Sequence, residues 1–117
     1  MLDPAGRFTD SSFVVDVRGA GTTRTVVLGG EFDLAGRDDF RTALRSALAD
    51  APETVVIDLT ELEFIDSVGI TAILRAHRHA ETVGTRLVLV PGPELVQRVF
   101  RLCGVETTLP FSPGPSG

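Results

Sequence analysis

The sequence has little of what disulfide-rich or membrane-spanning proteins need. Cys103 is its single cysteine, so no disulfide can form within the chain. A lone thiol in a helical pattern is typical of a small buried hydrophobic side chain. No uninterrupted apolar run approaches the roughly 18 residues of a bilayer span, and residues 1–7 lack the basic and apolar regions of an export signal. We therefore expect a cytoplasmic protein that has no membrane partner.

Positive charge is also scarce. The chain has 11 basic residues, all of them arginines, against 16 acidic residues, which gives a formal net charge of −5 at pH 7. A chain with this net charge lacks the positive electrostatic field that binding to a nucleic-acid phosphate backbone requires. We therefore expect no direct contact with nucleic acid.

The length and composition fit one folded domain. With 117 residues, of which 43% are hydrophobic, the chain can build its own core. Residues 1–11 are polar and rich in turn residues, and residues 112–117 consist of serine, proline and glycine. The sequence therefore predicts a loose N-terminal segment over 1–11, a domain over 12–111 and a flexible tail over 112–117.

The period of hydrophobicity alternates between that of strands and that of helices. The first two predicted strands form an antiparallel hairpin, and the third is so continuously apolar that we expect cover on both of its faces. This order predicts an α/β fold: a mostly parallel four-stranded sheet with an antiparallel edge strand, and helices packed as cover. In chain order the pattern predicts strands over 13–17 and 25–28, a helix over 35–50, a strand over 55–59, a helix over 67–83, a strand over 87–90 and a helix over 93–103.

Polar residues follow the predicted parallel strands in the segments 31–34 and 61–66. Loops at the carboxyl ends of parallel strands meet at one edge of the sheet, so Asp33 and Ser67 should lie near each other. Ser67 follows Asp66 at the start of a helix, where free amides and the helix dipole would tolerate a phosphate. Serine and aspartate are also common helix N-caps, so from the spacing alone capping is the stronger interpretation of both residues.

The segments Gly30-Glu31-Phe32-Asp33-Leu34 and Phe64-Ile65-Asp66-Ser67-Val68-Gly69-Ile70 change that balance. Together with 56–60 and 86–90, they make the chain resemble the STAS domain of bacterial anti-sigma-factor antagonists over residues 12–111. The resemblance implies a single STAS-like domain whose Ser67 is phosphorylated by an anti-sigma factor serine kinase, with Asp33 involved in kinase recognition. It also implies that the unphosphorylated form binds the kinase and frees a sigma factor, and that a serine phosphatase reverses the modification.

One side of the helix over 67–83 could be contacted by such a partner. At 100° per residue, a polar stripe of Ser67, Thr71, Arg75, Arg78 and Thr82 lies opposite the apolar side chains. A phosphate on Ser67 would add about −1.5 to −2 charges, beside Glu61, Glu63 and Asp66, and would weaken binding without a change of fold. The predicted partner-binding residues are Asp33, Asp66, Ser67, Thr71 and Arg75.

Catalysis, a metal and a cofactor are not expected. His77 lies ten residues, about 15 Å, along the helix from Ser67, too far to act as its base. His77 and His79 point about 200° apart, which disfavours joint metal binding. The first helix's Arg37, Arg41 and Arg45 are interpreted as its solvated side. An alternative stays open: a STAS-type scaffold or ligand-sensing module that binds a nucleotide or anion at this edge without being phosphorylated.

Overall fold

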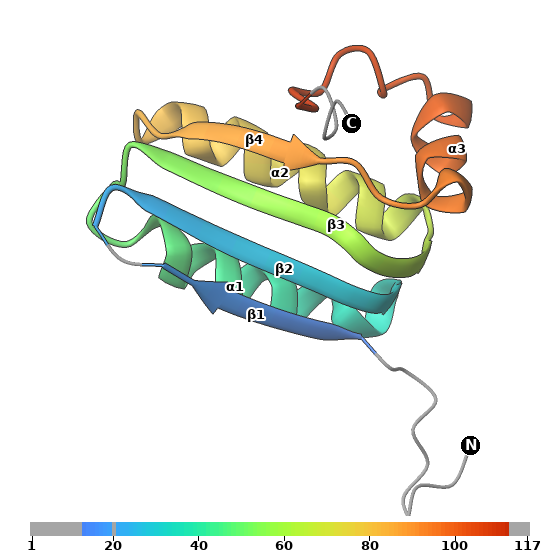
Figure 1. Cartoon of the computed structure of the whole chain (residues 1–117), viewed down its shortest axis with the longest axis horizontal. Coiled ribbons are helices and arrows are strands. Elements are labelled where there is room, and N and C mark those ends of the chain that lie inside the picture. Colours follow the sequence, from blue (N-terminus) through green and yellow to red (C-terminus); the bar gives the residue numbers. More distant parts are fainter. Residues whose placement is uncertain (1–12, 20, 113–117) are drawn as a thin grey trace, which may run out of the picture.

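The computed structural model describes residues 13–19 and 21–112 (Figure 1). The segments predicted to be loose, 1–11 and 112–117, lie outside these residues except for Ser112, whose amide donates to the Leu89 carbonyl at 2.8 Å. The elements in chain order are β1 (Val14–Arg18), β2 (Thr23–Phe32), the 3₁₀ helix η1 (Leu34–Gly36), α1 (Arg37–Leu48), β3 (Thr54–Ile65), α2 (Ser67–Thr82), β4 (Arg86–Val90) and α3 (Glu94–Leu102).

The sheet has the predicted topology. Its strand order is β1-β2-β3-β4, with β1 antiparallel to β2 and the other pairs parallel. Each parallel connection contains a helix, so α1 and α2 both run opposite to the strands and lie in the same direction as each other. The predicted α/β fold with an antiparallel edge strand is therefore confirmed.

Helices α1 and α2 cover only one face of the sheet, behind the strands in Figure 1. The expectation that strand 55–59 is covered on both faces is wrong: Val55 and Ile57 are fully buried, but Val56 between them is only partly buried. The reason is topological. From β2 to β4, each successive strand lies on the same side of the one before it in the sheet. Right-handed crossovers that all step across the sheet in the same direction place their helices on the same face.

Strands β2 and β3 are longer than predicted. We expected a loop over 61–66, but β3 continues to Ile65 and pairs with the end of β2 through Phe32↔Ile65. Two irregularities make this extension possible: the register shifts between Val27 and Gly29, and again between Gly30 and Glu31. Gly30 has a φ of 77°, a conformation that glycine adopts at little cost.

Helix α3 lies at one end of the sheet (Figure 1) and buries Val96, Gln97 and Phe100. The prediction that Cys103 is buried is wrong, because this thiol is exposed. Leu102 beside it is 77% exposed, so the last turn of the short helix extends beyond the core. In the described part of the chain, no helix combines the length and apolar character needed to cross a membrane.

Candidate functional site at the start of helix α2

Asp66, and not Ser67, caps helix α2. The Asp66 carboxylate accepts hydrogen bonds from the amides of Val68, at 2.9 Å, and Gly69, at 3.0 Å. Ser67 is the first helical residue, and its side chain is exposed. Within the described residues the Ser67 hydroxyl makes no hydrogen bond. Capping therefore explains Asp66 but not Ser67, whose hydroxyl has no hydrogen-bond partner in the described part of the chain.

The first turn of α2 packs directly against the end of β2. The Asp66 amide donates to the Phe32 carbonyl at 3.2 Å. A Cβ atom added to Gly69 would lie 2.9 Å from the same carbonyl oxygen and 2.7 Å from Cγ1 of Ile65, so a larger residue fits here only if these atoms shift. Phe32 is fully buried, and its ring stacks on Phe13 with centroids 4.6 Å apart. The position of Ser67 is thus fixed by buried packing below it.

Asp33 lies at the same edge. It follows Phe32 and caps η1, where its carboxylate accepts a hydrogen bond from the Ala35 amide at 3.0 Å. Asp33 directly follows Phe32 in the chain, and Ser67 directly follows Asp66. Phe32 and Asp66 are joined by the backbone hydrogen bond described above. The structure therefore brings together the two residues that the loop argument expected to meet.

Helix α2 has the predicted apolar side and the predicted polar side. Ile73, Ala76 and Ala80 are buried against the sheet. His77 is partly buried and His79 is exposed. The residues of the predicted polar stripe are all exposed: Ser67, Thr71, Arg75, Arg78 and Thr82.

A groove of about 450 Å³ runs between α1 and α2, with Ser67 among its lining residues. Sequence reasoning missed it, because the pairing of two helices far apart in the chain is a tertiary feature. Its only sequence signal was the four-residue spacing of three arginines, which we interpreted as the solvated side of α1. The lining residues are Arg37, Phe40, Arg41, Leu44 and Arg45 from α1, and Ser67, Val68, Thr71, Ala72, Arg75, Ala76 and His79 from α2.

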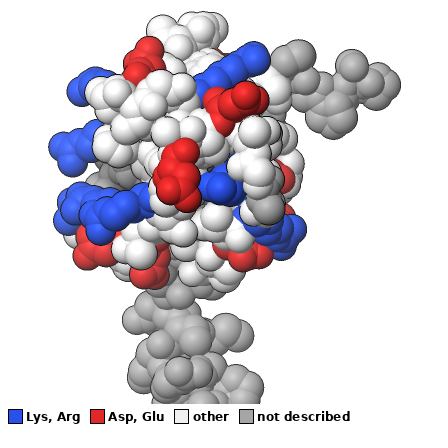
Figure 2. Space-filling view, turned by 90° about the vertical axis from the view of Figure 1, so that its left-hand side faces the viewer, with Lys and Arg blue, Asp and Glu red and all other residues white. Residues whose placement is uncertain are grey.

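The basic side chains of this groove project from the helical side of the molecule. In Figure 2 that side is on the left, and several arginines extend from it. No carboxylate is among the residues that line the groove. We call it the arginine groove.

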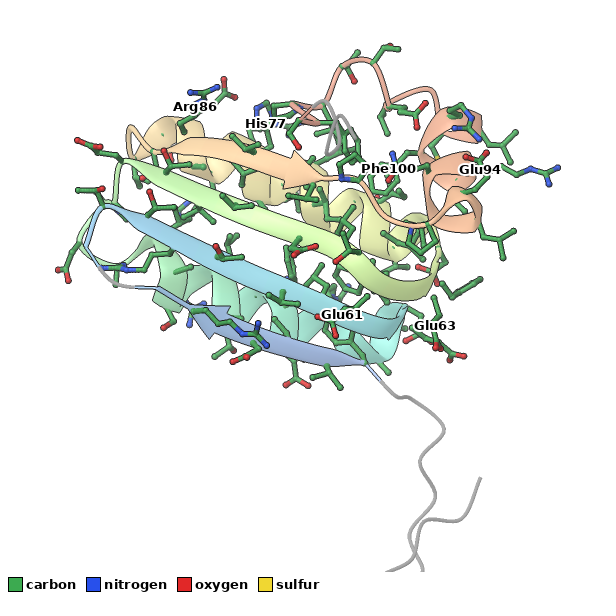
Figure 3. The ribbon with its side chains drawn as sticks, viewed as in Figure 1. Glu61, Glu63, His77, Arg86, Glu94 and Phe100 are labelled. Carbon is green, nitrogen blue, oxygen red and sulfur yellow. The ribbon has the colours of Figure 1, made fainter. Side chains whose placement is uncertain are left out.

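Glu61 and Glu63 lie apart from the arginine groove. Glu61 is next to Gly29 and, with Arg18, lines a second hollow on the sheet face away from α1 and α2 (Figure 3). In that hollow, the Arg18 guanidinium donates a hydrogen bond to the Asp16 carboxylate at 2.8 Å, and this bond, together with the Asp16 charge, raises the pKa of Arg18. Glu63 is exposed near the carboxyl end of β3. Of the three carboxylates expected beside Ser67, Asp66 is therefore its immediate neighbour, and Glu61 faces away.

Comparisons with known proteins identify the family of the chain. The sequence model of the family described as "Mlab, STAS domain" matches residues 15–110. The anti-sigma-F factor antagonist RsfB of Mycobacterium tuberculosis is 30% identical over 97 residues, which are 83% of this chain and 79% of RsfB.

Two solved structures extend the likeness to the fold. An anti-sigma factor antagonist from Mycobacterium paratuberculosis superposes with a TM-score of 0.78 at 26% identity, covering 89% of this chain and 88% of that one. The unphosphorylated form of the anti-sigma factor antagonist SpoIIAA, from Bacillus, has a TM-score of 0.70 at 24% identity and covers 85% of this chain and 88% of that one. The second likeness concerns the fold alone.

Proposed function

Because the chain belongs to the STAS domain family, we propose that it is an anti-sigma factor antagonist controlled by phosphorylation of Ser67. The unphosphorylated form binds an anti-sigma factor and so frees a sigma factor. The anti-sigma factor is a serine kinase that modifies Ser67 and thereby releases the antagonist. A serine phosphatase restores binding, and the chain itself carries out no catalysis.

The exposed hydroxyl of Ser67 is the observation that carries this proposal. A kinase needs an accessible acceptor, and the fold can do without this one because Asp66 supplies the helix cap. The positive end of the α2 dipole also favours an added negative charge, although the amides of Val68 and Gly69 are already bonded to Asp66. The modified domain is therefore expected to stay folded.

The residues around Ser67 provide a surface for the partner. Asp33 and Asp66 lie at the edge of the sheet, and Thr71 and Arg75 continue the exposed side of α2. A hundredfold loss of affinity needs only about 2.8 kcal/mol. An unfavourably placed charge at an interface can supply several kcal/mol. One phosphate at Ser67 is therefore enough to switch binding off.

The test is to mix the purified chain with Mg-ATP and each serine-kinase anti-sigma factor encoded in the same genome. We expect intact-mass spectrometry to show the gain of one phosphate, which is lost in Ser67→Ala and retained in Ser46→Ala, a matched change of an exposed serine on α1 that does not line the groove. Calorimetry should show that Ser67→Ala binds the kinase at every ATP concentration and that Ser67→Asp binds it more weakly. Binding without phosphate transfer would favour a scaffold module, and equal affinity of the two variants would overturn the switch.

A further inference from the structure

We propose that the arginine groove binds an acidic amphipathic segment of the anti-sigma partner, and that a phosphate on Ser67 competes with that segment for the same arginines. The identity of the partner rests on the proposed function. The chemistry of the segment follows from the residues that line the groove.

The charge of the groove selects an acidic occupant. Its lining includes Arg37, Arg41, Arg45 and Arg75, and no acidic side chain. In the part of the chain that the structure describes, none of these four guanidinium groups forms a salt bridge. The molecule as a whole carries a net charge of −5, so this groove is a local region of opposite sign. Arginine forms paired hydrogen bonds with carboxylates, which favours glutamate or aspartate in the partner.

The shape of the groove calls for an amphipathic segment. Phe40, Leu44 and Ala76 are buried side chains at its base, and Val68 and Ala72 are partly buried beside them. The lining extends from Ser67 to His79, thirteen residues that span about 18 Å along α2. That length matches about three turns of a helix laid between α1 and α2, with apolar side chains toward the base and carboxylates toward the arginines.

Ser67 lies in the same groove as the arginines, so phosphorylation would act on their charge. Since α1 and α2 run in the same direction, their first residues, Arg37 and Ser67, lie at the same end of the groove. A phosphoserine there adds about −1.5 to −2 charges and three strong hydrogen-bond acceptors, which arginines bind well. This phosphate would offset up to half of the positive charge of the four groove arginines. Phosphorylation therefore removes an attraction as well as adding a repulsion.

The first experiment uses a synthetic helical peptide with leucine on one side and glutamate on the other. Fluorescence anisotropy measures its affinity, and amide chemical shifts map its site on the full chain. We expect shifts at groove residues of α1 and α2, affinity that falls as salt rises, and much weaker binding of a matched peptide with lysine in place of glutamate.

A pair of double variants distinguishes an effect of the groove arginines on peptide affinity from an effect of the net charge. The double variant Arg41→Gln/Arg75→Gln should lower peptide affinity at least tenfold. Arg86→Gln/Arg98→Gln removes the same charge from exposed arginines outside the groove and should change it less than twofold. All four positions are exposed, and circular dichroism checks that each variant is folded. Equal losses in both variants, or equal binding of the lysine peptide, would overturn the proposal.

Phosphoserine placed at position 67 by genetic code expansion tests the competition. It should weaken the glutamate peptide at least tenfold in the wild-type background and much less in Arg41→Gln/Arg75→Gln. If the peptide fails to bind the groove while a kinase does bind and modify Ser67, this inference is wrong and the proposed function stands. If no anti-sigma factor binds the chain but the peptide results hold, the proposed function is wrong and the acidic specificity of the groove stands.

Discussion

Asp66 and Ser67 are neighbours with separable roles, one in stability and one in binding. Replacing Asp66 with alanine leaves the amides of Val68 and Gly69 without their acceptor. The loss of such a cap costs about 1 kcal/mol, within a range of roughly 0.5–2 kcal/mol. Urea unfolding followed by circular dichroism should show that decrease for Asp66→Ala, and a smaller one for Asp66→Asn, because asparagine can still cap.

Ser67→Ala is the matched control for that measurement. The Ser67 side chain is exposed and has no hydrogen-bond partner among the described residues, so its removal should change the free energy of unfolding by less than about 0.5 kcal/mol. If Ser67→Ala proved as destabilising as Asp66→Ala, Ser67 would be part of the cap. Its exposed hydroxyl would then no longer be spare for modification.

The contact between helix α2 and strand β2 predicts the effect of Gly69→Ala. Alanine should favour the helix by about 1 kcal/mol over glycine. The new methyl group would, however, lie 2.9 Å from the Phe32 carbonyl oxygen, which the backbone cannot easily move. Overpacking costs about 1–3 kcal/mol, which offsets or exceeds the helix gain, so we expect a net destabilisation of up to about 2 kcal/mol in thermal or urea unfolding. Thr71→Ala, at an exposed position of the same helix, should be neutral or stabilising; a stabilised Gly69→Ala would show that the contact is loose.

The elements differ in how far the sequence could predict them. Helix α2 could be predicted closely, because Asp66 begins it and Gly84, with a φ of 78°, follows its end. The extension of β3 to Ile65 could not, because it depends on register shifts in β2 that no hydrophobic pattern records. The meeting of Asp33 with Ser67 follows from parallel-sheet topology. The arginine groove requires the packing of α1 against α2, which helical periodicity alone cannot give.

At the scale of the whole molecule, the one-sided arrangement of helices separates two surfaces. The helical side carries the arginine groove and the start of α2, whereas the opposite sheet face carries Glu61 and the salt bridge of Arg18 with Asp16. A buried layer that includes Val55, Ile57 and Leu59 lies between the helices and the sheet. A charge added at Ser67 therefore acts on the helical side, with a closely packed core between it and the other face.

This separation predicts that phosphorylation leaves the fold in place. Phosphoserine at position 67 should take the net charge from −5 to about −6.5 or −7 at pH 7. Amide chemical shifts should then change at the first turns of α1 and α2 and around Asp33, while β1 and α3 keep theirs. Comparison of nitrogen–proton correlation spectra of the two forms measures this directly. Changes spread across β1 and α3 would instead require a rearranged core, and affinity would then be controlled by conformation and not by charge at the groove.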